Sequence, residues 1–139
     1  MQQRKMILAF VVVVIAAFST ISSGQIPRYE SPPLLTVGTT YVKIYQDTDA
    51  LFLPGHTCVY SAKLLAGVRY KITVSVPSGT DFDLRVYDGN GNLVASSLKG
   101  RGTDESAYVT PRWTGRFRIK VTDHSGSGLF TLKVWKRML

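Results

Sequence analysis

The sequence predicts an all-β fold, a jelly-roll-like β-sandwich of about eight antiparallel strands. The first observation is alternation with a period of two. In "VRYKITVSV", residues 68–76, the apolar positions fall on one face and the polar ones on the other. The second is punctuation by turn residues, because Gly, Pro, Asn and Asp clusters interrupt the chain about every 8–12 residues. The third is the lack of a sustained helical period beyond the N-terminal segment.

Eight runs account for the predicted strands, and turns separate them. The runs are residues 39–46, 57–67, 68–76, 82–86, 92–98, 107–110, 116–121 and 129–135. The connecting stretches "PSGTD", "DGNG", "PRWTG" and "TDHSGSG" are rich in residues that favour turns. In "RFRIKV" the side chains of Phe117, Ile119 and Val121 are expected to be buried. The alternating Arg and Lys side chains are expected to face water.

The N-terminal residues 1–24 read as a signal peptide or an uncleaved membrane anchor. "MQQRK" is basic and free of acids, and the apolar run "MILAFVVVVIAAF" is shorter than the about 20 residues that span a membrane. Small residues at Ser22 and Gly24 favour cleavage after Gly24. Residues 25–36 contain three prolines and are interpreted as a linker, which leaves residues 37–139 as the domain. Either reading predicts a secreted or cell-surface protein that meets a membrane only through an uncleaved N-terminal segment.

The formal net charge of the chain is +8 at pH 7. A basic exported domain is expected to attract an extracellular polysaccharide, an envelope component or a secreted protein. Nucleic acid is not an expected partner, because no recognition helix or aromatic-basic RNA motif is present. No catalytic residue set stands in a recognisable context, so the protein is not predicted to be an enzyme. The single cysteine, Cys58, cannot form an internal disulfide and reads as a small buried residue.

A row of basic residues near the C-terminus is the candidate ligand-binding site. Alternate residues of a strand share a face, so Arg116, Arg118 and Lys120 are expected to form one positive ladder. Guanidinium groups suit carboxylate, sulfate or phosphate, and an exposed Trp stacks on a sugar face. The full candidate set is Arg112, Trp113, Arg116, Arg118 and Lys120, with Arg69 and Lys71 as possible neighbours. The alternative is a solvated sheet face that discourages aggregation.

Acidic residues form a second candidate site. No cofactor is expected unless the domain binds calcium, for which Asp81, Asp83 and Asp104 are the candidate ligands. The alternative is that these acids serve solubility and pair with Arg85. The stretch "DGNGN" fails as a calcium-binding EF-hand loop, because Leu93 stands where the loop needs glycine. It is predicted to be a hairpin turn.

Taken together, "YSAKLLAGVRYKITVSV", "TDFDLRVYDGNGNLVASS" and "DESAYVTPRWTGRFRIKVTDHSGSGLFTLKVW" resemble the bacterial and archaeal pre-peptidase C-terminal domain. The resemblance covers residues 41–135 and includes the D-x-D-L motif at Asp81 and Asp83. It implies a jelly-roll-like sandwich of the kind that trails secreted peptidases and aids secretion, localisation or substrate binding. Some relatives bind collagen and calcium with the help of an acidic linker, whereas "PRYESPP" carries only Glu30.

These observations predict an exported, non-catalytic binding module for a cell-surface or extracellular polysaccharide or protein. Two alternatives stay open. The domain could be a structural subunit of a surface assembly or filament, in which the N-terminal segment pairs with a neighbouring sheet. It could also be an accessory subunit of a separately encoded secreted peptidase or hydrolase.

Overall fold

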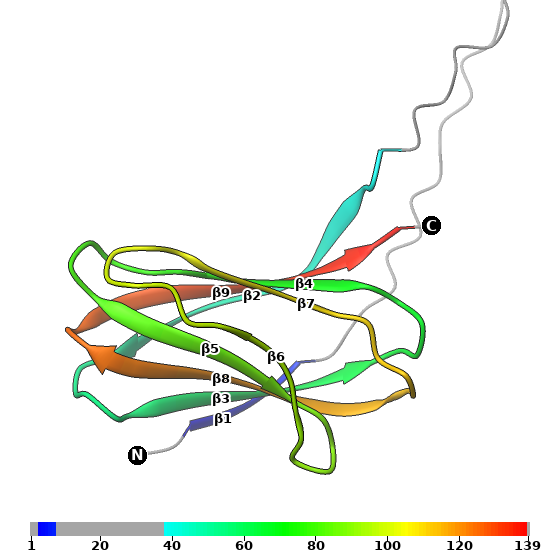
Figure 1. The fold of residues 1–139 in the computed structure, drawn as a ribbon, viewed down its shortest axis with the longest axis horizontal. Coiled ribbons are helices and arrows are strands. Elements are labelled where there is room, and N and C mark those ends of the chain that lie inside the picture. Colours follow the sequence, from blue (N-terminus) through cyan, green and yellow to red (C-terminus); the bar gives the residue numbers. More distant parts are fainter. Residues whose placement is uncertain (1–2, 8–37, 139) are drawn as a thin grey trace, which may run out of the picture.

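The computed structural model describes residues 3–7 and 38–138, which form two β-sheets packed face to face. Figure 1 shows one sheet above the other. The five-stranded sheet has the order β1-β3-β8-β5-β6, and the four-stranded sheet has the order β2-β9-β4-β7. The strands are β1 Gln3–Ile7, β2 Tyr41–Leu51, β3 Thr57–Leu64, β4 Tyr70–Ser75, β5 Asp81–Tyr87, β6 Leu93–Ser97, β7 Glu105–Val109, β8 Gly115–Ser125 and β9 Gly128–Arg137.

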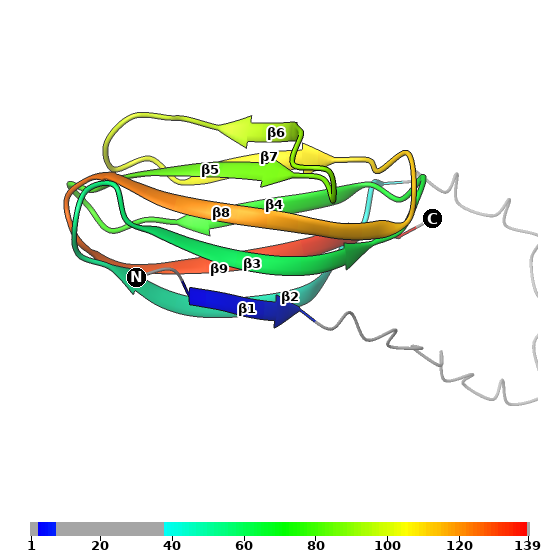
Figure 2. The ribbon, with the colours of Figure 1, turned by 90° about the horizontal axis from the view of Figure 1, so that it is seen from below.

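The predicted all-β sandwich is confirmed, and each of β2 to β9 overlaps one of the eight predicted runs. All pairings among these eight strands are antiparallel. The outer strands in Figure 2 are β1 and β6 of the five-stranded sheet, which is in front in this view. Alternation of polar and apolar residues therefore sufficed to find the strands, because each sheet buries one face and exposes the other.

β8 runs further than the sequence pattern predicts. Residues 122–125 were expected in a turn, and that prediction is wrong because cross-strand pairing continues through them. Thr122 pairs with Thr57 of β3 and Ser125 pairs with Asp81 of β5. The polar side chains of this stretch resemble a turn in composition, but its backbone lies between two neighbouring strands that satisfy its hydrogen bonds.

β1 is not predicted by the sequence. Its residues belong to the segment 1–24, and they pair in parallel with the stretch from Cys58 to Ala62 of β3. Residues 8–24 and the linker 25–36 lie outside the described residues, so cleavage after Gly24 stays a prediction. Within the ranges that the structure describes, no helix is long and apolar enough to cross a membrane.

The core lies between the two sheets and contains Cys58, as expected from its alternating surroundings. Phe82 of β5 and Phe130 of β9 meet edge to face across the sandwich, with ring centroids 5.9 Å apart. Side chains from all of β3, β4, β5, β7, β8 and β9 contribute to the same cluster. Burial of this continuous apolar layer is the main stabilising term for the fold.

The "DGNGN" stretch is a hairpin turn, as predicted. The Asp88 carboxylate accepts hydrogen bonds from the backbone N–H groups of Asn90 and Asn92, both at 2.9 Å. The Asn92 side-chain amide donates a third at 3.1 Å. These donors, with the Asn92 backbone N–H first among them, hold the pKa of Asp88 below its ordinary value. The Asp88 carboxylate is thus used in hydrogen bonds within the turn.

Candidate functional site

The predicted positive ladder exists on the outer face of the five-stranded sheet. Arg116, Arg118 and Lys120 project outward from β8, while the residues between them are buried in the core. Two further cations from neighbouring strands join them, Lys63 of β3 and Arg85 of β5. We call this set of five cations the basic face: Lys63, Arg85, Arg116, Arg118 and Lys120.

Register places like charges directly opposite one another on the basic face. Lys63 is the cross-strand partner of Arg116, and Arg85 is the cross-strand partner of Lys120. Like charges in directly opposed positions destabilise a sheet, in contrast to the opposite-charge pairs that stabilise one. One such pair lies on each edge of β8, toward β3 and toward β5, and both oppose folding. The stability of the sheet therefore does not explain them.

Little within the described part of the chain neutralises the basic face. One ion pair is found there, between Arg85 Nη1 and Asp83 Oδ2 at 3.4 Å. Lys120 Nζ lies 4.9 Å from the centroid of the Tyr87 ring, which is a cation–π contact. This contact holds the ammonium in place and leaves its charge uncompensated. The positive field of the face is therefore available to an anion.

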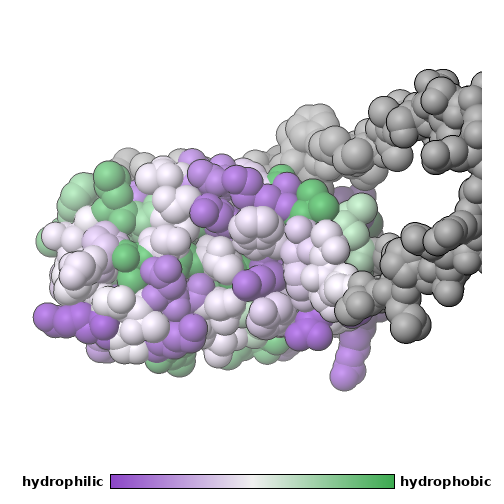
Figure 3. All heavy atoms as spheres, turned by 90° about the horizontal axis from the view of Figure 1, so that it is seen from above, coloured by the Kyte–Doolittle hydropathy of each residue, from purple (hydrophilic) through white to green (hydrophobic). Residues whose placement is uncertain are grey.

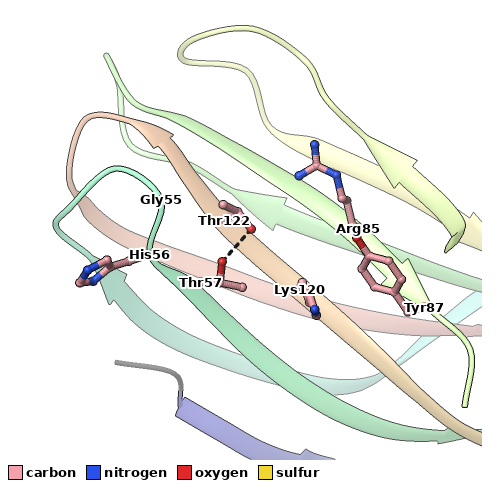
Figure 4. Close-up of a pocket in the computed structure, with 7 residues that line it drawn as sticks. All are labelled: Gly55, His56, Thr57, Arg85, Tyr87, Lys120 and Thr122. Atoms are coloured by element: carbon pink, nitrogen blue, oxygen red, sulfur yellow. Dashed lines mark hydrogen bonds between the residues drawn. The ribbon is translucent and has the colours of Figure 1, made fainter. Parts of the chain in front are cut away.

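A shallow hollow of about 480 Å³ adjoins the ladder. Figure 4 shows Arg85 and Tyr87 of β5 on one side of Lys120, and the Thr57–Thr122 hydroxyl pair beyond it. The two threonine hydroxyls lie 3.0 Å apart. Gly55 and His56 of the β2–β3 loop complete the lining at the far end. The hollow offers ammonium, guanidinium and hydroxyl donors, which suit a carboxylate-bearing or sulfated sugar.

Arg112 and Trp113 do not belong to the basic face. They lie in the β7–β8 connection and line a second hollow of about 360 Å³ together with Val94 and Tyr108. Trp113 is half-exposed there, and its ring lies against the start of β8 at Gly115. The five residues predicted as one binding site therefore divide into a ladder of three and a separate pair.

Arg69 and Lys71 are also placed elsewhere. They lie against Tyr108 on the four-stranded sheet, with Arg69 Cζ 4.7 Å and Lys71 Nζ 6.0 Å from the ring centroid. The residues that sequence reasoning missed are Lys63, Arg85, Tyr87, Thr57 and Thr122. The only signal for them was their alternating position in a run, which does not say which strands become neighbours.

The three candidate calcium ligands do not form a cluster. Asp83 pairs with Arg85, and Asp104 Oδ1 accepts a hydrogen bond from the Val76 N–H at 2.9 Å. Among the described residues, no group of three or more His, Cys, Asp or Glu side chains is arranged to hold a metal ion. Calcium binding through Asp81 stays a prediction that the structure does not test.

Asp123 is an inward-facing carboxylate of β8 that the sequence placed in a turn. Its side chain is completely buried, and neither carboxylate oxygen has a hydrogen-bond partner among the described residues. Its backbone joins the β2–β3 loop to β8, since its carbonyl accepts from Gly55 N–H at 2.7 Å and its N–H donates to His56 O at 2.9 Å. Burial raises the pKa of Asp123 above its ordinary 3.8, and His56 and His124 only partly oppose this.

The substitution Asp123→Asn is therefore expected to stabilise the protein at neutral pH. A carboxyl whose folded pKa is raised contributes stability while protonated, and that contribution is lost as pH rises from about 3.8 through the folded pKa. The free energy of unfolding of the variant should exceed that of the wild type by about 1–3 kcal/mol at pH 7, and the two should differ little at pH 3.5. Urea unfolding at both pH values measures the difference. An advantage of the same size at both would contradict a charge-based origin.

No protein-family model matches the sequence, and neither does any curated protein. Solved structures do match its fold. The pre-peptidase C-terminal domain of a collagenase from Bacillus anthracis superposes with a TM-score of 0.57 at 19% identity, over 65% of this chain and 87% of that one. A periplasmic inhibitor of g-type lysozyme from Aeromonas hydrophila superposes with a TM-score of 0.53 at 14% identity, over 71% and 88%.

The first of these matches supports the resemblance that the sequence motifs indicate. The described sandwich therefore has the fold of a pre-peptidase C-terminal domain.

Proposed function

We propose that this protein is an exported, non-catalytic binding module for an acidic polysaccharide at the cell surface, and that the basic face is its binding site. The observation that carries the proposal is the presence of two like-charged cross-strand pairs, Lys63 opposite Arg116 and Arg85 opposite Lys120. A polyanion bound across β3, β8 and β5 would reduce the repulsion within both pairs at once. This reduction makes the free energy of binding more favourable.

The geometry favours an extended polymer over a small anion. The cations lie along β8 and on both of its neighbours, and the hollow beside them is open and shallow. Arg116 and Arg118 are exposed and project from alternate positions of one strand. Residues at this spacing on a strand lie about 7 Å apart, which suits repeating carboxylates on a chain. Sugar hydroxyls find donors and acceptors at Thr57 and Thr122.

The test is binding of the purified full-length chain to a soluble polyuronate, followed by calorimetry over a series of salt concentrations. The variant Arg116→Glu/Arg118→Glu is expected to lose affinity by about 10- to 100-fold at low salt and to show a shallower salt dependence. Circular dichroism checks that the variant is folded.

The matched control is Arg101→Glu/Arg112→Glu, which changes the net charge by the same amount at two exposed loop residues outside the basic face. It should retain most of the affinity. Equal losses in both variants would show that binding follows net charge alone and would overturn the assignment of the face. If the wild-type protein binds neither the polyuronate nor a neutral dextran, the proposed function is refuted.

A further inference from the structure

The outer face of the four-stranded sheet carries a second set of cations, which includes Arg69 and Lys71 and is separate from the basic face. Register places Lys43, Trp135, Lys71 and Tyr108 in one row across β2, β9, β4 and β7. Cations and aromatic rings alternate along this row. We call it the aromatic face, together with Arg69, whose guanidinium lies over the Tyr108 ring.

Contacts within the aromatic face order its rings without cancelling its charge. Arg69 and Lys71 both approach Tyr108, and the Tyr41 ring lies 6.3 Å from it at 60°. Trp135 Nε1 donates to Thr73 Oγ1 at 3.4 Å. Cation–π contacts hold cations close to ring faces but leave their full charge, so an anion can still be bound.

No carboxylate occupies an outward position of the four described strands of this sheet. The row next to the aromatic face is Gln46, Lys133, Thr73 and Ser106, and the row beyond it is Thr48, Thr131 and Ser75. In Figure 3, which views this face, hydrophilic and neutral residues cover most of the surface. The face is thus positive and polar, with exposed or half-buried aromatic rings within it.

The two cationic faces point in opposite directions, because they are the outer surfaces of the two packed sheets. The sheets of a sandwich lie about 10 Å apart, so one polymer chain cannot lie flat on both faces without wrapping around an edge. Aromatic rings stack on the apolar faces of sugars, and neighbouring Lys and Arg side chains bind the acidic groups of those sugars. The second face therefore has the chemistry for the same class of ligand.

From this arrangement we infer that the protein binds two strands of acidic polysaccharide at once and cross-links them through its opposite faces. The inference rests on the proposed function, since one of the two sites is the basic face. It goes further in making the module bivalent, so that its effect is to join polymer chains and not only to coat them.

The experiment measures light scattering while the full-length protein is titrated into the soluble polyuronate. A bivalent protein gives a bell-shaped curve, because excess protein saturates each polymer strand with singly bound copies. The variant Arg69→Glu/Lys71→Glu should bind with an affinity reduced by only about 2- to 5-fold and should give at least about fivefold less scattering. Lys43→Glu/Lys71→Glu is a second variant of the same face, and dextran is the neutral control.

The outcomes separate the two proposals. Undiminished scattering by both aromatic-face variants would overturn bivalence and leave polymer binding by the basic face intact, and cross-linking by self-association of the protein would produce that same result. Absence of any binding by the wild type would refute the proposed function itself. Loss of scattering in both aromatic-face variants, with binding retained, would confirm that the aromatic face is a second, independent site.

Discussion

The substitution Phe82→Ala is expected to lower the free energy of unfolding by about 3–5 kcal/mol. The Phe82 side chain is 1% exposed and meets Phe130 of the opposite sheet edge to face, so it contacts both layers of the sandwich. Its removal leaves a cavity at the sheet–sheet interface, where the β-strands cannot collapse without losing register. The total free energy of unfolding of a domain of this size is about 5–15 kcal/mol, so the expected loss is a large share of its stability.

Urea unfolding followed by tryptophan fluorescence measures this effect. Phe52→Ala provides the matched control, because the Phe52 side chain is 67% exposed in the β2–β3 loop. That variant should change the unfolding free energy by about 0.5 kcal/mol or less. Similar losses in the two variants would mean that the described core does not carry the stability of the fold.

Gly126→Ala is the second substitution with a large expected effect, about 2–4 kcal/mol. Gly126 has φ +99, and an added Cβ would lie 2.9 Å from Thr80 Cα and 3.0 Å from Thr80 Cγ2. Thr80 cannot move away easily. It is buried, its hydroxyl donates to Pro77 O at 2.7 Å, and its carbonyl accepts from Gly102 N–H at 2.6 Å. Backbone strain and steric overlap therefore add.

Gly55→Ala separates the two contributions to the Gly126 effect. Gly55 has φ +85, but a Cβ there would meet nothing within 4 Å. This control carries the conformational strain alone and should cost about 1–2 kcal/mol. Thermal unfolding of both variants gives the comparison. Should Gly55→Ala prove as costly as Gly126→Ala, the contact with Thr80 would have no role.

The sequence predicted strands well because their signal is local. In residues 68–76 the five apolar side chains that alternate are those that the sandwich buries or partly buries. The hairpin turn at Asp88 could be predicted equally well, since one acid, two amides and two glycines within five residues supply the hydrogen bonds and the backbone freedom that a turn needs. Both features depend on near neighbours in the chain, and both were recovered.

The site was predicted only in part because its remaining members depend on register. The ladder on β8 follows from one strand, but Lys63 and Arg85 join it only because β3 and β5 flank β8. The β7–β8 connection carries Arg112 and Trp113 away from the ladder although they are close in sequence. Asp123 was missed for a related reason, since its polar stretch forms a strand only between two partners.

The start of β2 and the end of β9 lie side by side at one end of the sandwich. Tyr41 begins β2, Arg137 ends β9, and the two are cross-strand partners, with Met138 N–H donating to Thr40 O at 2.8 Å. Figure 1 shows both strand ends on the same side. Tension applied between these ends would load the β2–β9 pair by peeling, so that its hydrogen bonds break one after another and do not share the force. The sandwich is consequently poorly suited to carry tension that is applied between these two strand ends.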